Sequence, residues 1–277
     1  MSLGLKKILI KARRQVFSEM IGNNPSMFRG EGYDFFELRD YMIGDDTRHI
    51  DWIITAKMNK PYVKVFHKEH QINVAIVPIL NGSVFFGTAR LKQDLIAEIS
   101  AILGFSTIKN GDSFRSFLMA DKLYHETKTS KKLHSVEKMA TLVSDFDAID
   151  KGFNLQIIQD ELMIRLKRKS LIFLIGDFFD FPDLHLLARK HEVIAIVVRD
   201  RAEEQLPDLG ESTLIDPQSG AYYEGGISST QKKAYASKVK AIDERNRENF
   251  KKHQIRFVKI YTDEDPFTKL ISLFRMV

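Results

Sequence analysis

The sequence predicts an α/β protein in which a mostly parallel sheet lies between two layers of helices. Three segments, at 72–79, 170–176 and 192–198, are short and almost continuous apolar runs. Strands that are buried on both faces of a sheet have this composition. Segments with helical patterns separate the runs, and right-handed crossovers between parallel strands then give a doubly wound, three-layer domain.

The sequence before this domain predicts an N-terminal extension made of a helix, a charged segment and a strand. Apolar residues recur near a 3.6-residue period over 3–21, which predicts an amphipathic helix. Asp45 or Asp46 is expected to cap a helix that runs to about Met58. Residues 61–66 alternate and are rich in β formers, so they predict a strand.

The remaining elements follow one another after the first buried strand. We expect a helix at 88–109, a strand at 113–120, helices at 134–145, 154–168 and 183–190, a hairpin around 216–220, a helix at 229–253, a strand at 255–261 and a helix at 266–275. We therefore predict two parts, an N-terminal extension of residues 1–70 and an α/β domain of residues 71–277.

Composition excludes several classes of protein. The 277 residues include no cysteine, which excludes disulfides, thiolate metal sites and a cysteine nucleophile. No run approaches the roughly 18 apolar residues that a transmembrane helix needs. From these two observations we expect a cytoplasmic protein without a membrane span.

The usual catalytic motifs are also missing from the sequence. It has no HExxH histidine pair, no GxSxG elbow and no complete glycine-rich phosphate loop. No pair of carboxylates stands out as a general acid and base. We therefore expect a protein that is not an enzyme and that needs no cofactor.

The segment from Phe28 to Lys57 combines glycines, acids, arginines and aromatics more densely than a plain helix or strand needs. Either ion pairs fix an irregular segment here, or the segment is a prepared surface for a protein partner. Asp45 and Asp46 have cation-binding chemistry, but we expect them to pair with an arginine. The only tryptophan of the chain is expected to be largely buried. The candidate binding or structural residues are Gly30, Gly32, Glu37, Arg39, Tyr41, Gly44, Asp45, Asp46, Arg48, Asp51 and Trp52.

Ordered motifs within this segment carry a family resemblance. They are Gly30-x-Gly32-x-Asp34-Phe35, Glu37-Leu38-Arg39-x-Tyr41, Gly44-Asp45-Asp46-x-Arg48-x-Ile50-Asp51-Trp52 and Thr55-Ala56-Lys57. On these motifs the chain resembles the bacterial family catalogued as domain of unknown function 58, and the similarity extends to residues 270–275. The resemblance implies a von Willebrand factor A-like domain. It also implies a protein partner, a MoxR-type AAA+ ATPase, beside which members are typically encoded.

The resemblance further implies a metal-ion-dependent adhesion site, in which an Asp-x-Ser-x-Ser motif, a later Thr and a last Asp hold Mg²⁺. In this chain Ile79 stands in place of the leading Asp, Asn81 in place of the first Ser, and Ser83 matches the second Ser. Asn154 stands in place of the Thr, and Asp177 matches the last Asp. Mg²⁺ is usually held through one or two carboxylates, so loss of the leading one weakens binding. We expect a degenerate, metal-free pocket, in which Asp177 has the alternative role of capping the following turn.

Two classes of function follow from these observations. The first is a non-enzymatic interaction module that acts as adaptor or assembly partner of a MoxR-type ATPase. The second is a protein that binds nucleic acid or an anionic surface through the basic helix near 231–252, because residues 231–259 hold ten Lys or Arg against three Asp or Glu. No nucleic-acid motif accompanies that helix, so a solvated helix face is the simpler interpretation and nucleic acid is not the expected partner.

Overall fold

The computed structural model describes the chain in two compact units. An α/β domain comprises residues 1–28 and 72–277, and a small unit comprises residues 29–71. Within these units the described residues are 3–18, 37–45, 47, 50–65, 72–179, 183–208, 210–217 and 220–275.

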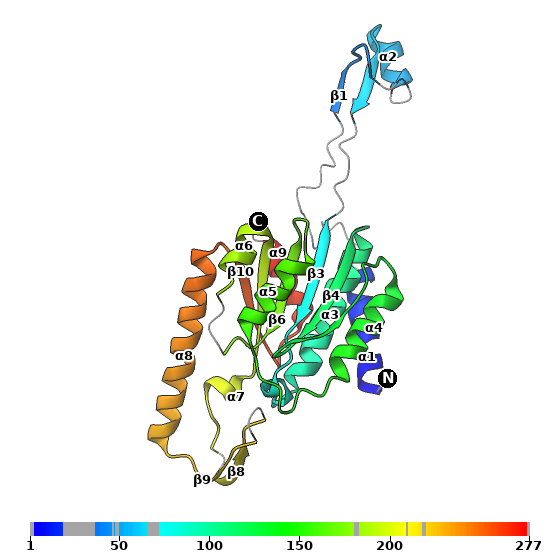
Figure 1. The fold of residues 1–277 in the computed structure, drawn as a ribbon. Coiled ribbons are helices and arrows are strands. Elements are labelled where there is room, and N and C mark those ends of the chain that lie inside the picture. The colour runs from blue at the N-terminus through cyan, green and yellow to red at the C-terminus, as the bar shows by residue number, and fades with distance from the viewer. Residues whose placement is uncertain are drawn as a thin grey trace. The chain divides into compact units, whose positions relative to one another are not determined.

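A six-stranded sheet forms the centre of the α/β domain (Figure 1). Its strand order is β10-β7-β6-β3-β4-β5, and every neighbouring pair is parallel except the edge pair β4–β5. The strands are β3 (Asn73–Pro78), β4 (Ser113–Met119), β5 (Leu123–Glu126), β6 (Leu171–Gly176), β7 (Glu192–Arg199) and β10 (Arg256–Tyr261). The predicted mostly parallel sheet is confirmed, and β5 is a strand that the sequence pattern did not indicate.

Helices cover both faces of this sheet, so the three-layer prediction is confirmed. Neighbouring residues of β3 explain why, since Ile76 belongs to the apolar core on one face and Val77 to the core on the other. The first core includes side chains of α1 (Leu3–Ser18), α3 (Lys92–Lys109), α4 (Leu133–Ser144) and α9 (Pro266–Arg275). The second core includes side chains of α5 (Leu155–Arg165), α6 (His185–Lys190) and α8 (Ser229–Lys252).

Helix α1 corrects the predicted division of the chain at residue 70. Its apolar residues Leu5, Leu9, Ala12 and Val16 lie on one helix face and are buried in the first core. An amphipathic helix is stable in water only when such a stripe is covered, and α3 provides the cover. The first 28 residues therefore belong to the α/β domain, and the small unit is an insertion after them.

The small unit contains a two-stranded antiparallel sheet and one short helix. The strands are β1 (Glu37–Asp40) and β2 (Tyr62–Val65), and the helix is α2 (Trp52–Met58). We expected Asp45 or Asp46 to cap this helix. Asp45 does not cap it, and Asp46 lies outside the described residues. Asp51 is the N-cap, because its carboxylate accepts hydrogen bonds from the backbone N–H groups of Ile53 and Ile54.

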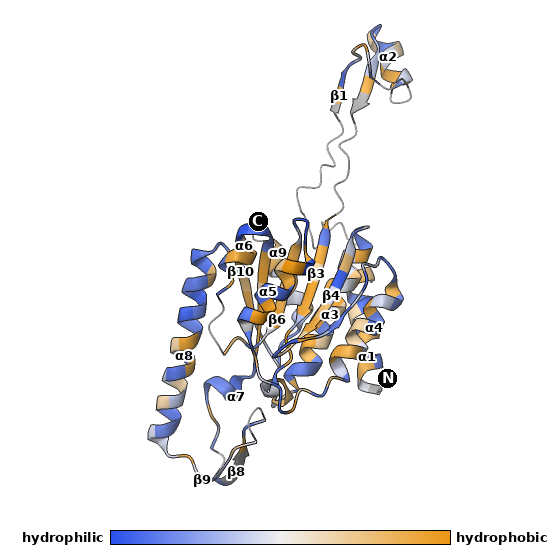
Figure 2. Ribbon diagram, viewed as in Figure 1, coloured by the Kyte–Doolittle hydropathy of each residue, from blue (hydrophilic) through white to orange (hydrophobic). Residues whose placement is uncertain are grey.

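The last third of the domain contains the predicted hairpin and the predicted basic helix. Strands β8 (Glu211–Ile215) and β9 (Tyr222–Gly226) pair around the turn at 216–220. Helix α8 begins with a capping box between Ser228 and Gln231. Figure 2 shows a hydrophilic α8 beside hydrophobic sheet strands, in agreement with a helix that buries only a narrow stripe.

Candidate functional site

The site lies where the order of the sheet strands reverses. Strands β3 and β6 are neighbours at the centre of the sheet, but the chain leaves β3 toward α3 on one face and β6 toward α6 on the other. In open α/β sheets, ligands bind in the crevice outside such strand ends. The segments here are residues 79–87, which include the short 3₁₀-helix η3 (Gly82–Phe85), and residues 177–179.

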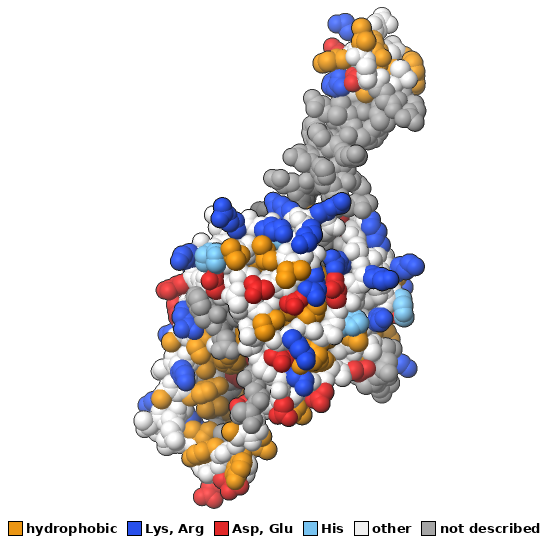
Figure 3. Space-filling view, viewed as in Figure 1, with side chains coloured by type: hydrophobic (Ala, Val, Ile, Leu, Met, Phe, Trp, Pro, Cys, Tyr) orange, Lys and Arg blue, Asp and Glu red, His pale blue; other side chains and the backbone are white. Residues whose placement is uncertain are grey.

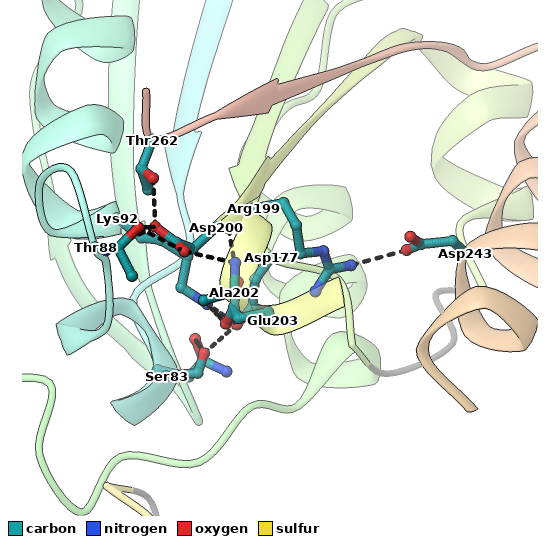
Figure 4. A network of polar contacts seen from close by, with 11 residues as sticks. Ser83, Thr88, Lys92, Asp177, Arg199, Asp200, Ala202, Glu203, Asp243 and Thr262 are labelled. Atoms are coloured by element: carbon teal, nitrogen blue, oxygen red, sulfur yellow. Dashed lines mark hydrogen bonds and ion pairs between the residues drawn. The ribbon is translucent and has the colours of Figure 1, made fainter. Parts of the chain in front are cut away.

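Three of the four predicted adhesion-site residues meet at this point, and Figure 4 shows two of them, Ser83 and Asp177. The Ser83 hydroxyl donates to the Asp177 carboxylate and lies 3.0 Å from the amide oxygen of Asn81. Ile79 occupies the leading position with a buried apolar side chain, and it faces Gly176. A Cβ at Gly176 would come within 3.1 Å of the Ile79 Cβ, so the strand ends are closely packed. The leading carboxylate of the adhesion pattern is thus replaced by an apolar contact.

Asn154, the fourth predicted residue, serves a different purpose. Its side-chain oxygen accepts a hydrogen bond from the backbone N–H of Ile157 and so caps α5. It is exposed, and none of its described contacts involves the other three residues. The structure therefore brings together Asn81, Ser83 and Asp177 but leaves Asn154 out.

A lysine that the sequence patterns did not single out lies in the middle of the site. Lys92, the first residue of α3, is completely buried. Its Nζ lies 3.4 Å from the Asp177 carboxylate and 2.5 Å from the Glu203 carboxylate. Burial raises the pKa of Asp177, but the charge of Lys92, the Ser83 hydroxyl and the charge of Arg199 outweigh burial and hold that pKa below its ordinary value.

A second buried cation lies beside this pair. Arg199, the last residue of β7, is completely buried and bonds Asp243 of α8 through Nη2 at 2.8 Å. The Phe179 ring lies 3.8 Å from the Arg199 guanidinium carbon and 5.4 Å from the Lys92 Nζ. An aromatic face attracts cations, so Phe179 helps to hold both in a region shielded from water.

The residue after β7 ties the same region together through hydrogen bonds. Asp200 accepts from the backbone N–H and the hydroxyl of Thr88, from the hydroxyl of Thr262 and from the N–H of Ala202. It caps the short helix α7 (Arg201–Glu204), and Glu203 completes the capping box. Burial raises the pKa of Asp200, whereas the threonine hydroxyls and backbone N–H groups outweigh burial and lower it.

The oxygen atoms of the site do not fit an adhesion-type Mg²⁺ ion. The Asp177 oxygen that faces Ser83 also faces Lys92. One Glu203 oxygen is bound to Lys92, and the other accepts the N–H of Asp200. A hard cation needs several free oxygen ligands at short distance, and here an ammonium group already contacts one oxygen of each carboxylate. Among the described residues, no group of three histidines or acids converges in a way that suits a metal.

Sequence reasoning missed Lys92, Arg199 and Glu203, although two signals were present. Lys92 begins a helix whose next fifteen residues are almost all buried, and a positive charge at a helix N-terminus opposes the helix dipole. Such a lysine needs a strong reason to be there, and an internal carboxylate provides one. Arg199 and Asp200 follow a buried strand directly, at the edge where parallel sheets carry their sites.

In the small unit, two charged residues of the signature segment, Arg39 and Asp45, form an ion pair that we call the Arg39–Asp45 brace. Arg39 on β1 makes two hydrogen bonds to the Asp45 carboxylate, at 2.8 and 2.6 Å, and Asp45 also accepts the N–H of Met42. The Arg39 hydrogen bonds, followed by that of Met42, lower the pKa of Asp45. Gly44 has φ +108°, a conformation that side-chain-bearing residues rarely adopt. The predicted pairing of this acidic segment with Arg39 or Arg48 is therefore confirmed for Asp45, whose partner is Arg39.

Other signature residues have more modest places. The Tyr41 N–H donates to the Pro61 carbonyl and extends the pairing of β1 and β2. Glu37 begins β1. Gly30, Gly32, Asp46 and Arg48 lie outside the described residues.

The tryptophan of the signature is on the surface. Trp52 is 69% exposed, so the expectation that it is largely buried is wrong. The reason is that α2 is a seven-residue helix without a single buried side chain, in a unit too small to cover it. Other large apolar side chains of the unit are also exposed, and with Trp52 they define what we call the apolar surface of the small unit: Met42, Ile43, Trp52, Ile53 and Met58.

The basic helix α8 presents its charge to solvent. The exposed Lys and Arg side chains are Lys233, Lys238, Lys240, Arg245, Arg247, Lys251 and Lys252, whereas Lys232 is half-buried and pairs with Asp208 at 3.1 Å. Residues of α8, β10 and α7 line a cavity of about 440 Å³, and Lys259 on its wall pairs with Asp243 and Glu204. Figure 3 shows acidic and basic side chains interspersed over the middle of the visible face of the α/β domain.

Comparisons with known proteins identify relatives without a described activity. The model of the family described as "Protein of unknown function DUF58" matches residues 37–246. "Uncharacterized protein Mb1516" of Mycobacterium bovis and "Uncharacterized protein Rv1480" of Mycobacterium tuberculosis are each 26% identical to the chain over 235 residues, covering 82% of it and 74% of the relative.

Two solved structures are similar to the chain at low sequence identity. BatB from Bacteroides thetaiotaomicron has a TM-score of 0.47 at 8% identity, covering 74% of this chain and 98% of that one. An aerotolerance-related membrane protein from Bacteroides fragilis has a TM-score of 0.45 at 9% identity, covering 74% of this chain and all of that one.

The second of these proteins is described as a membrane protein, and this contradicts the cytoplasmic location expected from the sequence. That expectation rested on the lack of cysteine and of a long apolar run. Neither property determines location, because a water-exposed domain can be attached to a membrane through another segment or an anchor. In the part of the chain that the structure describes, no helix combines the length and the apolar composition needed to cross a bilayer.

Proposed function

We propose, for a chain that belongs to the family Protein of unknown function DUF58, the function of a non-enzymatic protein-interaction module that works with a MoxR-type AAA+ ATPase. The α/β domain would be of the von Willebrand factor A type with a degenerate adhesion site. The small unit would carry the contact with the partner.

The apolar surface of the small unit is the observation that carries this proposal. Trp52 and Ile53 are 69% and 71% exposed in the first turn of a helix whose backbone is capped by Asp51. Exposed large apolar side chains on a folded unit are candidates for contact with a partner, and tryptophan is enriched among the residues that dominate binding energy. The Arg39–Asp45 brace and the Asp51 cap keep this surface ordered without burying it.

The state of the adhesion-type site supports the same division of roles. Lys92 is completely buried and Asp177 is only 3% exposed, so a partner's carboxylate does not reach a cation there. The ATPase partner itself is inferred from the resemblance in the signature segment. Contact through an apolar surface would also be less sensitive to salt than contact through charges.

A binding experiment with the full chain tests the proposal. Trp52→Ala should weaken binding to the ATPase encoded beside the gene by about 30-fold, the effect of removing a residue worth about 2 kcal/mol. Ile164→Ala on α5 is the matched control, since Ile164 is an apolar residue of the other unit that is 60% exposed. Binding that is lost in the control, or unchanged in Trp52→Ala with the fold intact, would contradict the proposal.

Helix α8 supports a second candidate function, binding to nucleic acid or another polyanion. Its exposed Lys and Arg side chains have the charge such binding needs. Binding of a DNA duplex should then weaken steeply with salt, with a slope that falls when Lys251 and Lys252 are replaced by alanine. A flat salt dependence would exclude this candidate.

A further inference from the structure

The site between β3 and β6 contains its own cation. We infer that the ammonium group of Lys92 takes the place of a divalent metal ion and permanently links Asp177 and Glu203 at the centre of the sheet. The protein would then hold this region together without any metal.

The contacts of Lys92 are those of a bound cation. Its Nζ lies 2.5 Å from Glu203 and 3.4 Å from Asp177, and the Asp177 oxygen also accepts the Ser83 hydroxyl. Figure 4 shows these side chains converging from η3, α3, the end of β6 and α7. The ammonium therefore joins segments that are more than a hundred residues apart in the sequence.

Burial makes this link obligatory for Lys92. A lysine without solvent contact is tolerated when carboxylates neutralise it and accept its hydrogen bonds. The apolar residues that follow it in α3 fix the helix in the core, so the side chain has no route to solvent. Both of its carboxylate partners are also buried, and each has a further hydrogen bond that orients it.

The described groups around Lys92 add no free oxygen ligand for a metal ion. Phe179 lies against Lys92 and Arg199, and the preceding residue, Phe178, has a carbonyl that accepts from Asn246 of α8 at 2.6 Å. The side chain of Ile79 supplies no oxygen where an adhesion-type site has its leading carboxylate. A cation tethered by a covalent side chain has no open coordination position and does not exchange.

Thermal unfolding of the full chain tests the inference through Lys92→Met, which removes the charge and keeps most of the length. Leaving Asp177 and Glu203 buried without their cation should lower the thermal midpoint by about 5–15 °C. The control Lys138→Met changes an exposed lysine of α4 and should shift the midpoint by no more than about 2 °C. Equal midpoints for the two variants would overturn the inference.

A double-mutant cycle covers the case in which Lys92→Met folds poorly. Adding Glu203→Gln to Lys92→Met should recover part of the lost midpoint, because one unpaired buried charge is removed. Glu203→Gln alone should lower the midpoint. A double variant that is no more stable than Lys92→Met would contradict a direct link between the two residues.

Metal titration gives a readout that needs no variant. The midpoint of the natural chain should not change between excess EDTA and millimolar MgCl₂ or MnCl₂, whereas Lys92→Ala should gain stability from the metal and lose that gain when Asp177→Asn is added. A metal-dependent rise in the natural chain that disappears in Asp177→Asn would show that a metal displaces Lys92, and the inference would fail. These readouts are independent of any partner of the small unit.

Discussion

At the scale of single residues, the signature segment shows how local hydrogen bonds shape a surface. Arg39 and Asp45 hold the turn before α2, and Asp51 satisfies the free N–H groups at the start of that helix. The neighbouring Trp52 makes no comparable structural contribution, because most of its surface is in solvent. Charge in this segment therefore organises the backbone, and the apolar residues remain available for contact.

Asp51→Ala should destabilise the small unit by about 1 kcal/mol, because the cap of α2 is lost. Trp52→Ala should change stability by less than about 0.5 kcal/mol, since its side chain is exposed. Amide hydrogen exchange of residues 52–58 measures both effects directly. Asp51→Ser, which keeps a capping oxygen, should behave like the natural chain. A larger loss of protection in Trp52→Ala than in Asp51→Ala would contradict this prediction.

At the scale of elements, helices α3 and α8 differ in how much of their surface is buried. Helix α3 is buried on all sides and forms the centre of one layer, whereas α8 touches the domain along a narrow stripe. Helix α1 is intermediate, because one of its faces is buried and Lys11 forms two ion pairs with the domain, which we call the ionic clasp. In that clasp Lys11 lies 2.9 Å from both Glu98 of α3 and Asp265 beside α9.

The clasp predicts acid sensitivity in the docking of α1. Burial raises the pKa of Asp265, but Lys11, Gln15 and Thr268 outweigh it and lower the pKa from 3.8 to about 2. Because the folded-state pKa is depressed, this contribution is complete above the unfolded value and is lost as pH falls from about 4 through about 2.

Hydrogen exchange of residues 3–18 at pH 5 and pH 3 checks this dependence. Protection of α1 should fall in acid, and Asp265→Asn should be less protected at pH 5 with a smaller further loss at pH 3. Asp160→Asn on α5 is the control, because Asp160 is exposed and lies on another helix. Identical pH responses in all three proteins would contradict a role for Asp265.

The attachment of α8 rests on a few apolar contacts. Phe250 is buried between Phe178 and Phe257, with ring centroids 5.8 and 5.4 Å away. Phe250→Ala should therefore cost about 3–5 kcal/mol of unfolding free energy, measured by chemical denaturation. Lys238→Ala on the exposed face of the same helix should stay within about 0.5 kcal/mol. A small effect at Phe250 would mean that α8 is not part of the cooperative fold.

At the scale of the whole molecule, the chain separates into an α/β domain and an inserted small unit, with different chemistry in each. The strand reversal of the domain creates the usual place for a ligand, yet two buried cations and their acids fill it. Among the described residues of the small unit, helix α2 has no buried side chain, and Met42, Ile43, Trp52, Ile53 and Met58 are exposed. The proposed contact with a partner is therefore assigned to the small unit, and the strand ends are assigned a structural role.

The amino-acid pattern alone was enough to predict the α/β class and most strand and helix positions. The spacing of apolar residues indicates which side of a helix or strand is buried, so the positions of these elements can be predicted from the sequence. The N-cap residue of α2 could not be predicted in this way, because Asp45, Asp46 and Asp51 are all of a residue type that caps helices well. Short elements without a full period, such as β5 and α7, left no pattern to recognise.

Three features follow from the folded chain alone: Lys92 meets Asp177 and Glu203, α1 joins the α/β domain, and Trp52 is exposed. Each of these depends on which distant segment covers a side chain. Apolar periodicity predicts which face of an element is buried. It does not predict which distant element covers that face, because burial, charge pairing and packing have to be satisfied together in the folded chain.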